Sequence, residues 1–276
     1  MRLSLVALFL VVLTASGAAA HDDEARLRGL DAALARAGGS AALLMQRAEI
    51  ERAEGRWASA ESDLARAAKI APGSAALARC RAALALDRGE PEAALVAVRA
   101  CTDPQRARDP RLPWLEAEAL VRLGRYDEAA RIMDAAIAAG HGATAERYLE
   151  RAALAEHRRD EGMPGALATL EAGLARWPRA WILVTRAIDI DVALERFDSA
   201  LARIDAEIPS AQRPEALLAR RGDVLALAGR PLPAREAWTA ALAALESRPT
   251  PDAETRRLVQ QLHTSLAAPN ATVGAP

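Results

Sequence analysis

The sequence predicts an all-α protein made of helical hairpins that stack one after another along the chain. The first observation is a set of alanines that recur 34, 35, 37, 34 and 34 residues apart: Ala60, Ala94, Ala129, Ala166, Ala200 and Ala234. A period near 34 residues is typical of helical-repeat proteins. The second observation is that aromatic residues make up only 3% of the chain. That fraction is low for one large globular core, but it suits a solenoid in which small side chains pack between neighbouring helices.

The start of the chain, residues 1–20, has the pattern of a secretory signal peptide. Arg2 precedes an apolar run from Leu5 to Leu13, and small residues follow as far as Ala20. The alternative is an uncleaved membrane anchor, but a spanning helix needs about 20 apolar residues and this run is shorter. We therefore expect residues 1–20 to be removed during export, and the mature protein to be periplasmic or secreted without inserting into a membrane.

Both ends of the mature chain are predicted to be capping helices, because stacked repeats otherwise expose an apolar face at each end. Residues 21–40 contain an N-terminal cap with Leu27, Leu30 and Leu34 on one face. Residues 249–276 contain a C-terminal capping helix, followed by a disordered tail. Its apolar residues are Val259, Leu262 and Leu266.

Between the caps, a two-helix pattern repeats from residue 41 to residue 248. Each repeat opens with apolar residues at helical spacing, which predicts a first helix with one buried face. In four repeats this helix ends at a glycine, which readily takes the positive φ that closes a helix: Gly55, Gly89, Gly124 and Gly229. We expect small residues where the two helices of a hairpin cross. On the first helices these are Ala48, Ala82, Ala117 and Gly222.

One 34-residue segment carries a recognisable set of residues at positions 8, 15, 17, 20, 27 and 32, namely Ala48, Gly55, Trp57, Ala60, Ala67 and Pro72. This set resembles a tetratricopeptide repeat. The resemblance implies a right-handed superhelical solenoid of about six hairpins. The implied repeats are 41–74, 75–108, 110–143, 147–180, 181–214 and 215–248. The fourth and fifth depart from the pattern, because Glu161 and Glu195 replace the turn glycine. The links 102–110 and 140–146 hold the extra residues that lengthen two of the spacings.

The resemblance also implies that the first helices line a concave face that binds a peptide or protein. The residues predicted to contact a partner there are Arg79, Trp114, Glu118, Arg122, Tyr148, Arg151 and Arg158. Further along the same face lie Thr185, Asp189 and Asp223. Arginine suits the capture of carboxylates, and aromatic residues are frequent at binding hot spots. The alternatives are charges paired within the chain and aromatic rings packed between repeats. The family's pattern of lysine, asparagine and arginine for binding a peptide carboxylate is absent.

Cys80 and Cys101 fall on the two helices of one predicted hairpin. A disulfide persists in an oxidising compartment, so these cysteines form a possible disulfide that locks the hairpin. The alternative is two buried small residues in place of alanine.

His21 would become the mature N-terminus, where an amine beside an imidazole can chelate copper. The other histidines have no partner at ligand spacing, and we expect no metal site.

Charge and motifs exclude several classes of function. The chain carries 36 basic and 37 acidic side chains, and this balance argues against a nucleic-acid partner. No nucleophile with a base and no phosphate-binding glycine loop is present, so we expect neither an enzyme nor a cofactor. The predicted function is a noncovalent scaffold or adaptor that binds a protein or peptide of the bacterial cell envelope. The alternatives are a structural module that self-associates through its end caps, and an accessory protein of a metal-handling system that acts through His21.

Overall fold

The computed structural model describes residues 18–37, 39–104, 106, 109–246 and 252–267. Fourteen α-helices and no β-strand form the secondary structure of these residues, which confirms the all-α prediction. The helices fall into two compact units, Met1–Gly142 and Ala143–Pro276. The boundary lies in the link 140–146 that was predicted to lengthen the repeat.

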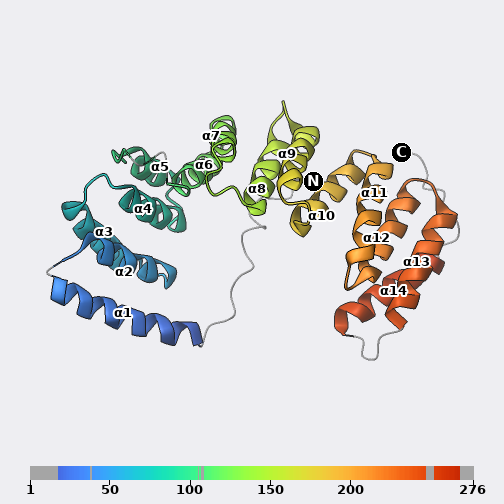
Figure 1. Cartoon of the computed structure of the whole chain (residues 1–276), viewed down its shortest axis with the longest axis horizontal. Coiled ribbons are helices and arrows are strands. Elements are labelled where there is room, and N and C mark those ends of the chain that lie inside the picture. The colour runs from blue at the N-terminus through green and yellow to red at the C-terminus, as the bar shows by residue number, and fades with distance from the viewer. Residues whose placement is uncertain (1–17, 38, 105, 107–108, 247–251, 268–276) are drawn as a thin grey trace. The chain divides into compact units, whose positions relative to one another are not determined.

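The N-terminal unit contains a capping helix followed by three helical hairpins (Figure 1). Its helices are α1 (Ala18–Ala37), α2 (Ala41–Ala53), α3 (Trp57–Ile70), α4 (Ala75–Asp87), α5 (Pro91–Arg99), α6 (Leu112–Arg122) and α7 (Tyr126–Ala138). The hairpins pair α2 with α3, α4 with α5 and α6 with α7, while α1 packs on α2. The first helices also stack, since α2 contacts α4 and α4 contacts α6.

The C-terminal unit continues the pattern with three more hairpins and a final helix (Figure 1). Its elements are α8 (Ala145–His157), α9 (Gly162–Arg176), α10 (Trp181–Ala193), α11 (Phe197–Glu207), the 3-10 helix η3 (Ile208–Ser210), α12 (Pro214–Leu227), α13 (Pro231–Glu246) and α14 (Ala253–Ala267). The hairpins pair α8 with α9, α10 with α11 and α12 with α13. Helix α14 packs on α13.

Five of the six hairpin turns share one backbone geometry, and the α8–α9 turn, where Arg158 is extended, differs. The predicted turn glycines all have a positive φ: Gly55 +73°, Gly89 +76°, Gly124 +72° and Gly229 +70°. The N–H of the next residue donates to the carbonyl five residues back, as from Arg125 to Leu120 at 2.8 Å. This bond closes the helix in a Schellman motif. Glu195 fills the same place between α10 and α11 with φ +57°, and the N–H of Arg196 makes the same bond to Asp191 at 2.7 Å.

Small residues lie where the helices of a hairpin cross, as the sequence predicts. Ala48, Ala82 and Ala117 are at most 1% exposed. Gly222 is the extreme case, because a Cβ atom placed on it would lie 2.3 Å from Cδ1 of Trp238 on the partner helix. The indole ring of Trp238 therefore occupies the space that a side chain at residue 222 would need.

The end helices cover the apolar faces of the hairpins beside them. Leu34 of α1 packs with Leu44 and Ala48 of α2. At the other end, Leu262 of α14 is buried among Ala219, Ala241 and Leu245, while Val259 and Leu266 are partly buried. The apolar stripe of α14 that was expected at a contact between copies is thus largely used within the chain.

The predicted signal peptide lies outside the described residues except for its last three, which form the start of α1. The side chain of His21 and the predicted tail, residues 268–276, also lie outside them.

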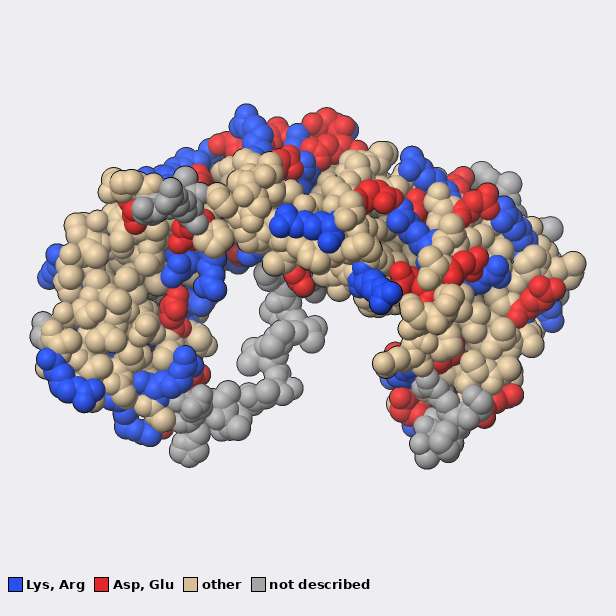
Figure 2. Space-filling model, in the orientation of Figure 1, with Lys and Arg blue, Asp and Glu red and all other residues tan. Residues whose placement is uncertain are grey.

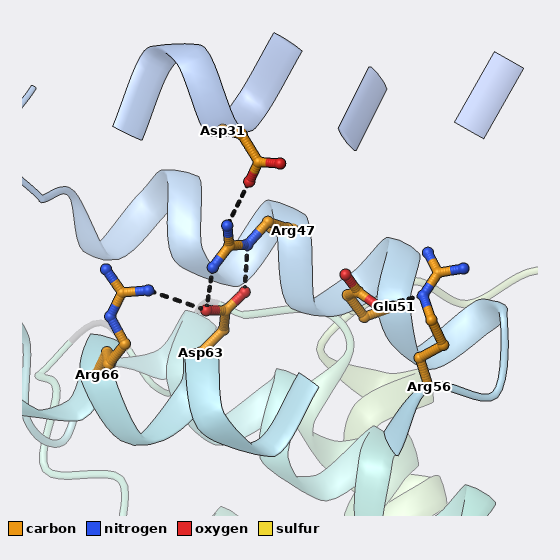
Figure 3. A network of polar contacts seen from close by, with 6 residues as sticks. All are labelled: Asp31, Arg47, Glu51, Arg56, Asp63 and Arg66. Carbon is orange, nitrogen blue, oxygen red and sulfur yellow. Dashed lines mark hydrogen bonds and ion pairs between the residues drawn. The ribbon is translucent and has the colours of Figure 1, made fainter. Parts of the chain in front are cut away.

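An ion-pair network joins α1, α2 and α3 (Figure 3). The guanidinium of Arg47 on α2 donates to both carboxylate oxygens of Asp63 on α3, at 2.6 and 2.5 Å. Arg47 also donates to Asp31 on α1, and Arg66 approaches Asp63 at 3.4 Å. The hydrogen bonding of Arg47 to Asp63 is the main cause that raises the pKa of Arg47 above its ordinary value. Because Asp63 is only 3% exposed, this bidentate pairing satisfies a buried charge.

The structure does not bring Cys80 and Cys101 into the possible disulfide, and both are buried free thiols in it. The reason is the direction in which Cys80 faces. Its side chain packs among residues of α2 and α3, including Leu44 and Leu64, and its thiol donates to Oε1 of Glu49 at 3.6 Å. Position 6 of this first helix therefore faces the preceding hairpin and not α5. Burial, together with the nearby carboxylate of Glu49, raises the pKa of the Cys80 thiol to about 12.

Candidate functional site

The charged residues predicted on the inner face of the N-terminal unit are paired within the chain. Arg79 lies 3.1 Å from Asp109, and Arg122 lies 2.6 Å from Glu118. Arg122 also donates to the carbonyl of Leu86 at 2.5 Å, which ties α6 to α4. One donor of Arg79, Nε, is buried without a hydrogen-bond partner among the described residues. Most of the charged side chains that a partner would meet on this face therefore already form ion pairs within the chain.

Trp114 is an interior residue of the N-terminal unit. It is 3% exposed, and its indole N–H donates to the carbonyl of His141 at 2.9 Å. The neighbouring Gly142 takes a positive φ of +55°, and a Cβ atom on it would lie 3.1 Å from the carbonyl oxygen of Pro110. The Trp114 side chain thus fastens the link after α7 to the start of α6 and has little surface left for a partner.

The three residues predicted on α8 and in the turn after it are held inside the C-terminal unit. Tyr148 is 6% exposed, and its ring packs edge-to-face on that of Trp177 with 5.6 Å between the ring centroids. Its side chain lies over Gly173 of α9. Arg151 is 5% exposed and donates to both oxygens of Glu161, at 2.7 and 3.0 Å. Arg158 pairs with Asp160 at 2.7 Å and with Glu161 at 2.8 Å. Glu161 thus binds two arginines here, while Gly162 takes the positive φ of this turn at +56°.

A cleft of about 390 Å³ opens between α10 and α12 of the C-terminal unit. Ile188, Ala211, Ala216 and Leu217 supply apolar lining. The residues that border it with polar or aromatic groups are Trp181, Thr185, Asp189, Glu207, Ser210, Arg213 and Arg220. Two of these, Thr185 and Asp189, belong to the face that the sequence predicts to be concave.

The link between α11 and α12 borders the cleft through Ser210, Ala211 and Arg213. Residues Ile208–Ser210 form η3, which contacts both α11 and α12. Consecutive first helices make extensive contacts in the pairs α2–α4, α4–α6 and α8–α10, but the contacts between α10 and α12 are reduced. The space between α10 and α12 stays open where these contacts are reduced.

Trp181 is the residue of this cleft that most resembles a binding hot spot. It begins α10 and is 49% exposed, although tryptophan is usually mostly buried. Aromatic residues that stand at the edge of an apolar cleft are frequent anchors for protein partners. Sequence reasoning did not select Trp181, because position 1 of a repeat is not among the positions expected to point into the groove. Its exposure follows from the separation of α10 and α12.

The charges around the cleft are mostly paired. Arg220 binds Asp189 at 2.7 Å, and Arg213 lies 3.2 Å from Glu215 and 3.9 Å from Asp252. Glu207 is only partly exposed, and its carboxylate has no side-chain partner among the described residues. On the face shown in Figure 2, acidic and basic side chains lie close together and form no broad field of one sign.

Asp223 follows on the inner side of α12. Its carboxylate accepts a hydrogen bond from the indole N–H of Trp238 at 3.0 Å. Burial raises the pKa of Asp223 above its ordinary value, and the hydrogen bond from Trp238 opposes part of this effect. Asp223 therefore acts within the α12–α13 hairpin, where it holds the ring that packs on Gly222.

Within the described part of the chain, no group of three or more His, Cys, Asp or Glu side chains is arranged to hold a metal ion. Among the same residues, no helix combines the length and the apolar character needed to cross a bilayer.

Comparison with known proteins identifies the fold. No protein-family model matches the chain, and no curated protein sequence matches it. Several solved structures do. The C-terminal part of a TPR repeat-containing protein from Cytophaga hutchinsonii is 13% identical and superposes with a TM-score of 0.62, over 86% of this chain and 95% of its own. The pilF protein of Pseudomonas aeruginosa is 15% identical, with a TM-score of 0.53 over 86% of this chain and 99% of its own.

A tetratricopeptide repeat protein from Parabacteroides merdae is 19% identical, with a TM-score of 0.52 over 88% of this chain and 93% of its own. At such identities the likeness concerns the fold alone. The helical hairpins, the small residues at their crossings and these superpositions agree, and the chain has the fold of tetratricopeptide-repeat proteins.

Proposed function

We propose that the protein is a noncovalent scaffold that binds a protein or peptide. The observation that carries this proposal is the α10–α12 cleft with the exposed indole of Trp181 at its edge. Its apolar lining and few polar groups have the character of a recognition site. Stacked helical hairpins also present side chains from several helices along one surface, which suits contact with an extended partner. The proposed action needs no catalytic group and no cofactor.

We further propose that the partner is a protein or peptide of the bacterial cell envelope, and that the protein is periplasmic or secreted. The support for this location is the pattern of residues 1–20, which is that of a secretory signal peptide. The pairing of nearly all inner-face arginines within the chain favours a partner recognised mainly by apolar contact, because engaged charges contribute little to a new interface.

The test is a comparison of captured partners. Tagged full-length protein is used to capture proteins from a cell-envelope extract, and the captured proteins are quantified by mass spectrometry beside two variants. Trp181→Ala removes the anchor of the cleft, whereas Trp57→Ala removes a comparably exposed indole from α3 in the N-terminal unit.

We expect a specific partner to be retained by the parent protein and by Trp57→Ala, and reduced about tenfold or more by Trp181→Ala. Circular dichroism of the variants checks that helicity is unchanged. Equal retention by all three proteins would contradict the role of the cleft.

A further inference from the structure

The α10–α12 cleft combines an aromatic face with a carboxylate that lacks a side-chain partner. We infer that it recognises a cationic side chain, lysine or arginine, next to apolar residues of the partner. This inference rests on the proposed function and adds the chemistry of the ligand to it. Its two principal groups are Trp181 and Glu207, which come from the start of α10 and the end of α11 and line the same space.

The aromatic group has the properties that a cation site requires. The indole of tryptophan attracts ammonium and guanidinium groups more strongly than the other aromatic rings do. Trp181 is about half exposed, and its side chain lines the cleft beside the apolar residues Ile188 and Leu217. A lysine or arginine can lay its aliphatic stem along such apolar residues while its charged end contacts the ring.

The charges around the cleft favour a cation over an anion. Two arginines border it, but Arg220 is held by Asp189, and Arg213 lies against Glu215 and Asp252. An anionic ligand would have to compete with these carboxylates. With these partners included, the cleft has two basic side chains, Arg213 and Arg220, and four acidic ones: Asp189, Glu207, Glu215 and Asp252. Among the described residues, Glu207 is the acidic side chain of this group that has no counter-charge. A cationic side chain would supply that missing charge.

The experiment uses the full chain and pools of short fluorescein-labelled peptides, measured by fluorescence polarisation. All pools share apolar flanking positions and differ only in the central residue, which is lysine, arginine, norleucine, citrulline or glutamate. Norleucine and citrulline keep much of the shape of lysine and arginine but lack their charge. We expect the lysine and arginine pools to bind about tenfold more tightly than their neutral counterparts, and the glutamate pool to bind most weakly.

The variants assign the effect to the cleft. Trp181→Leu and Glu207→Gln are each expected to weaken binding of the lysine pool about three- to tenfold, and Glu207→Gln should also remove most of its salt dependence. Two matched controls in the N-terminal unit, Trp57→Leu and Glu92→Gln, replace exposed residues of the same types and should leave affinity unchanged.

Three outcomes would overturn the inference. One is equal affinity for the charged and neutral pools. If Trp181→Leu still weakened that binding, the cleft would remain a peptide site and only its preference for cations would fail. Another is a preference for lysine that neither variant reduces, because the cation would then bind elsewhere. The third is no binding of any pool up to about 1 mM. The proposed function would still be judged independently by the capture experiment.

Discussion

Glu195 shows how one residue can depart from the repeat pattern while the backbone keeps it. The residue has φ +57° in a turn where the equivalent positions of four other hairpins are glycine. The left-handed region costs a non-glycine residue about 1–2 kcal/mol, yet the bond from Arg196 to Asp191 forms as it does elsewhere. The packing of α10 on α11 thus imposes the turn on a residue that disfavours it.

Replacing Glu195 by glycine is therefore expected to stabilise the protein. The free energy gained by removing the left-handed strain exceeds the free-energy cost of the greater conformational entropy of glycine in the unfolded chain. We therefore expect the free energy of unfolding to rise by about 0.5–1 kcal/mol. Gly124→Ala is the reciprocal variant, because a Cβ atom there meets no neighbour within 4 Å and only backbone strain is added. It should lower stability by about 1 kcal/mol in urea unfolding. A destabilised Glu195→Gly variant would contradict this account of the turn.

The second residue-scale prediction concerns Arg47. Arg47→Met would leave the buried carboxylate of Asp63 with only the exposed Arg66, 3.4 Å away, so we expect the free energy of unfolding to fall by about 3 kcal/mol. The control is Arg66→Met, which removes an exposed partner of the same carboxylate and should cost less than about 0.5 kcal/mol. Similar losses for the two variants would show that Arg47 has no special role.

The cysteines give a chemical test of the interior. Cys80 and Cys101 are 3% and 7% exposed, and the pKa of Cys80 is raised to about 12, so little thiolate is available in the folded protein. We expect an aromatic disulfide reagent to detect almost no thiol in the native protein and both thiols after unfolding in urea. If the unfolded, unreduced protein showed no reactive thiol, the cysteines would be joined as the sequence had suggested.

At the scale of elements, the sequence predicted the hairpins well and the surfaces less well. The turn glycines and the crossing alanines act through neighbours a few residues away, so their pattern indicates helix ends and helix pairing directly. The side chains of Trp114, Tyr148 and Arg151 depend instead on what lies opposite them, namely His141, Gly173 and Glu161. Those partners come from other elements, and periodicity alone does not reveal them. The exposure of Trp181 likewise depends on the reduced contact between α10 and α12, which the repeat period does not reveal.

The crossing of α12 and α13 provides a prediction at this scale. Gly222→Ala would place a Cβ atom against the ring of Trp238, and the ring or the helices would have to shift. We expect a loss of about 1–3 kcal/mol in the free energy of unfolding. The matched control is Gly29→Ala in α1, where a Cβ atom meets nothing within 4 Å and the higher helix propensity of alanine should stabilise by up to about 1 kcal/mol. Equal effects of the two substitutions would contradict a tight crossing.

At the scale of the molecule, the fold supplies many helix surfaces but few places open to a partner. In both units the charged side chains of the first helices are largely paired, and inter-repeat pairs such as Arg186 with Glu156 and Arg220 with Asp189 tie neighbouring hairpins together. At the α10–α12 cleft of the C-terminal unit, apolar side chains and Trp181 stay open beside one such pair. Our account therefore assigns recognition to that cleft and a mainly structural role to most of the inner-face arginines.

The most direct test of this assignment is hydrogen–deuterium exchange of the full chain with and without a partner identified by capture. The account predicts that saturating partner slows exchange in α10, η3 and the first turns of α12, because these segments surround Trp181 and Glu207. Protection confined to other helices, with exchange in these segments unchanged, would contradict the claim that the cleft is the binding site.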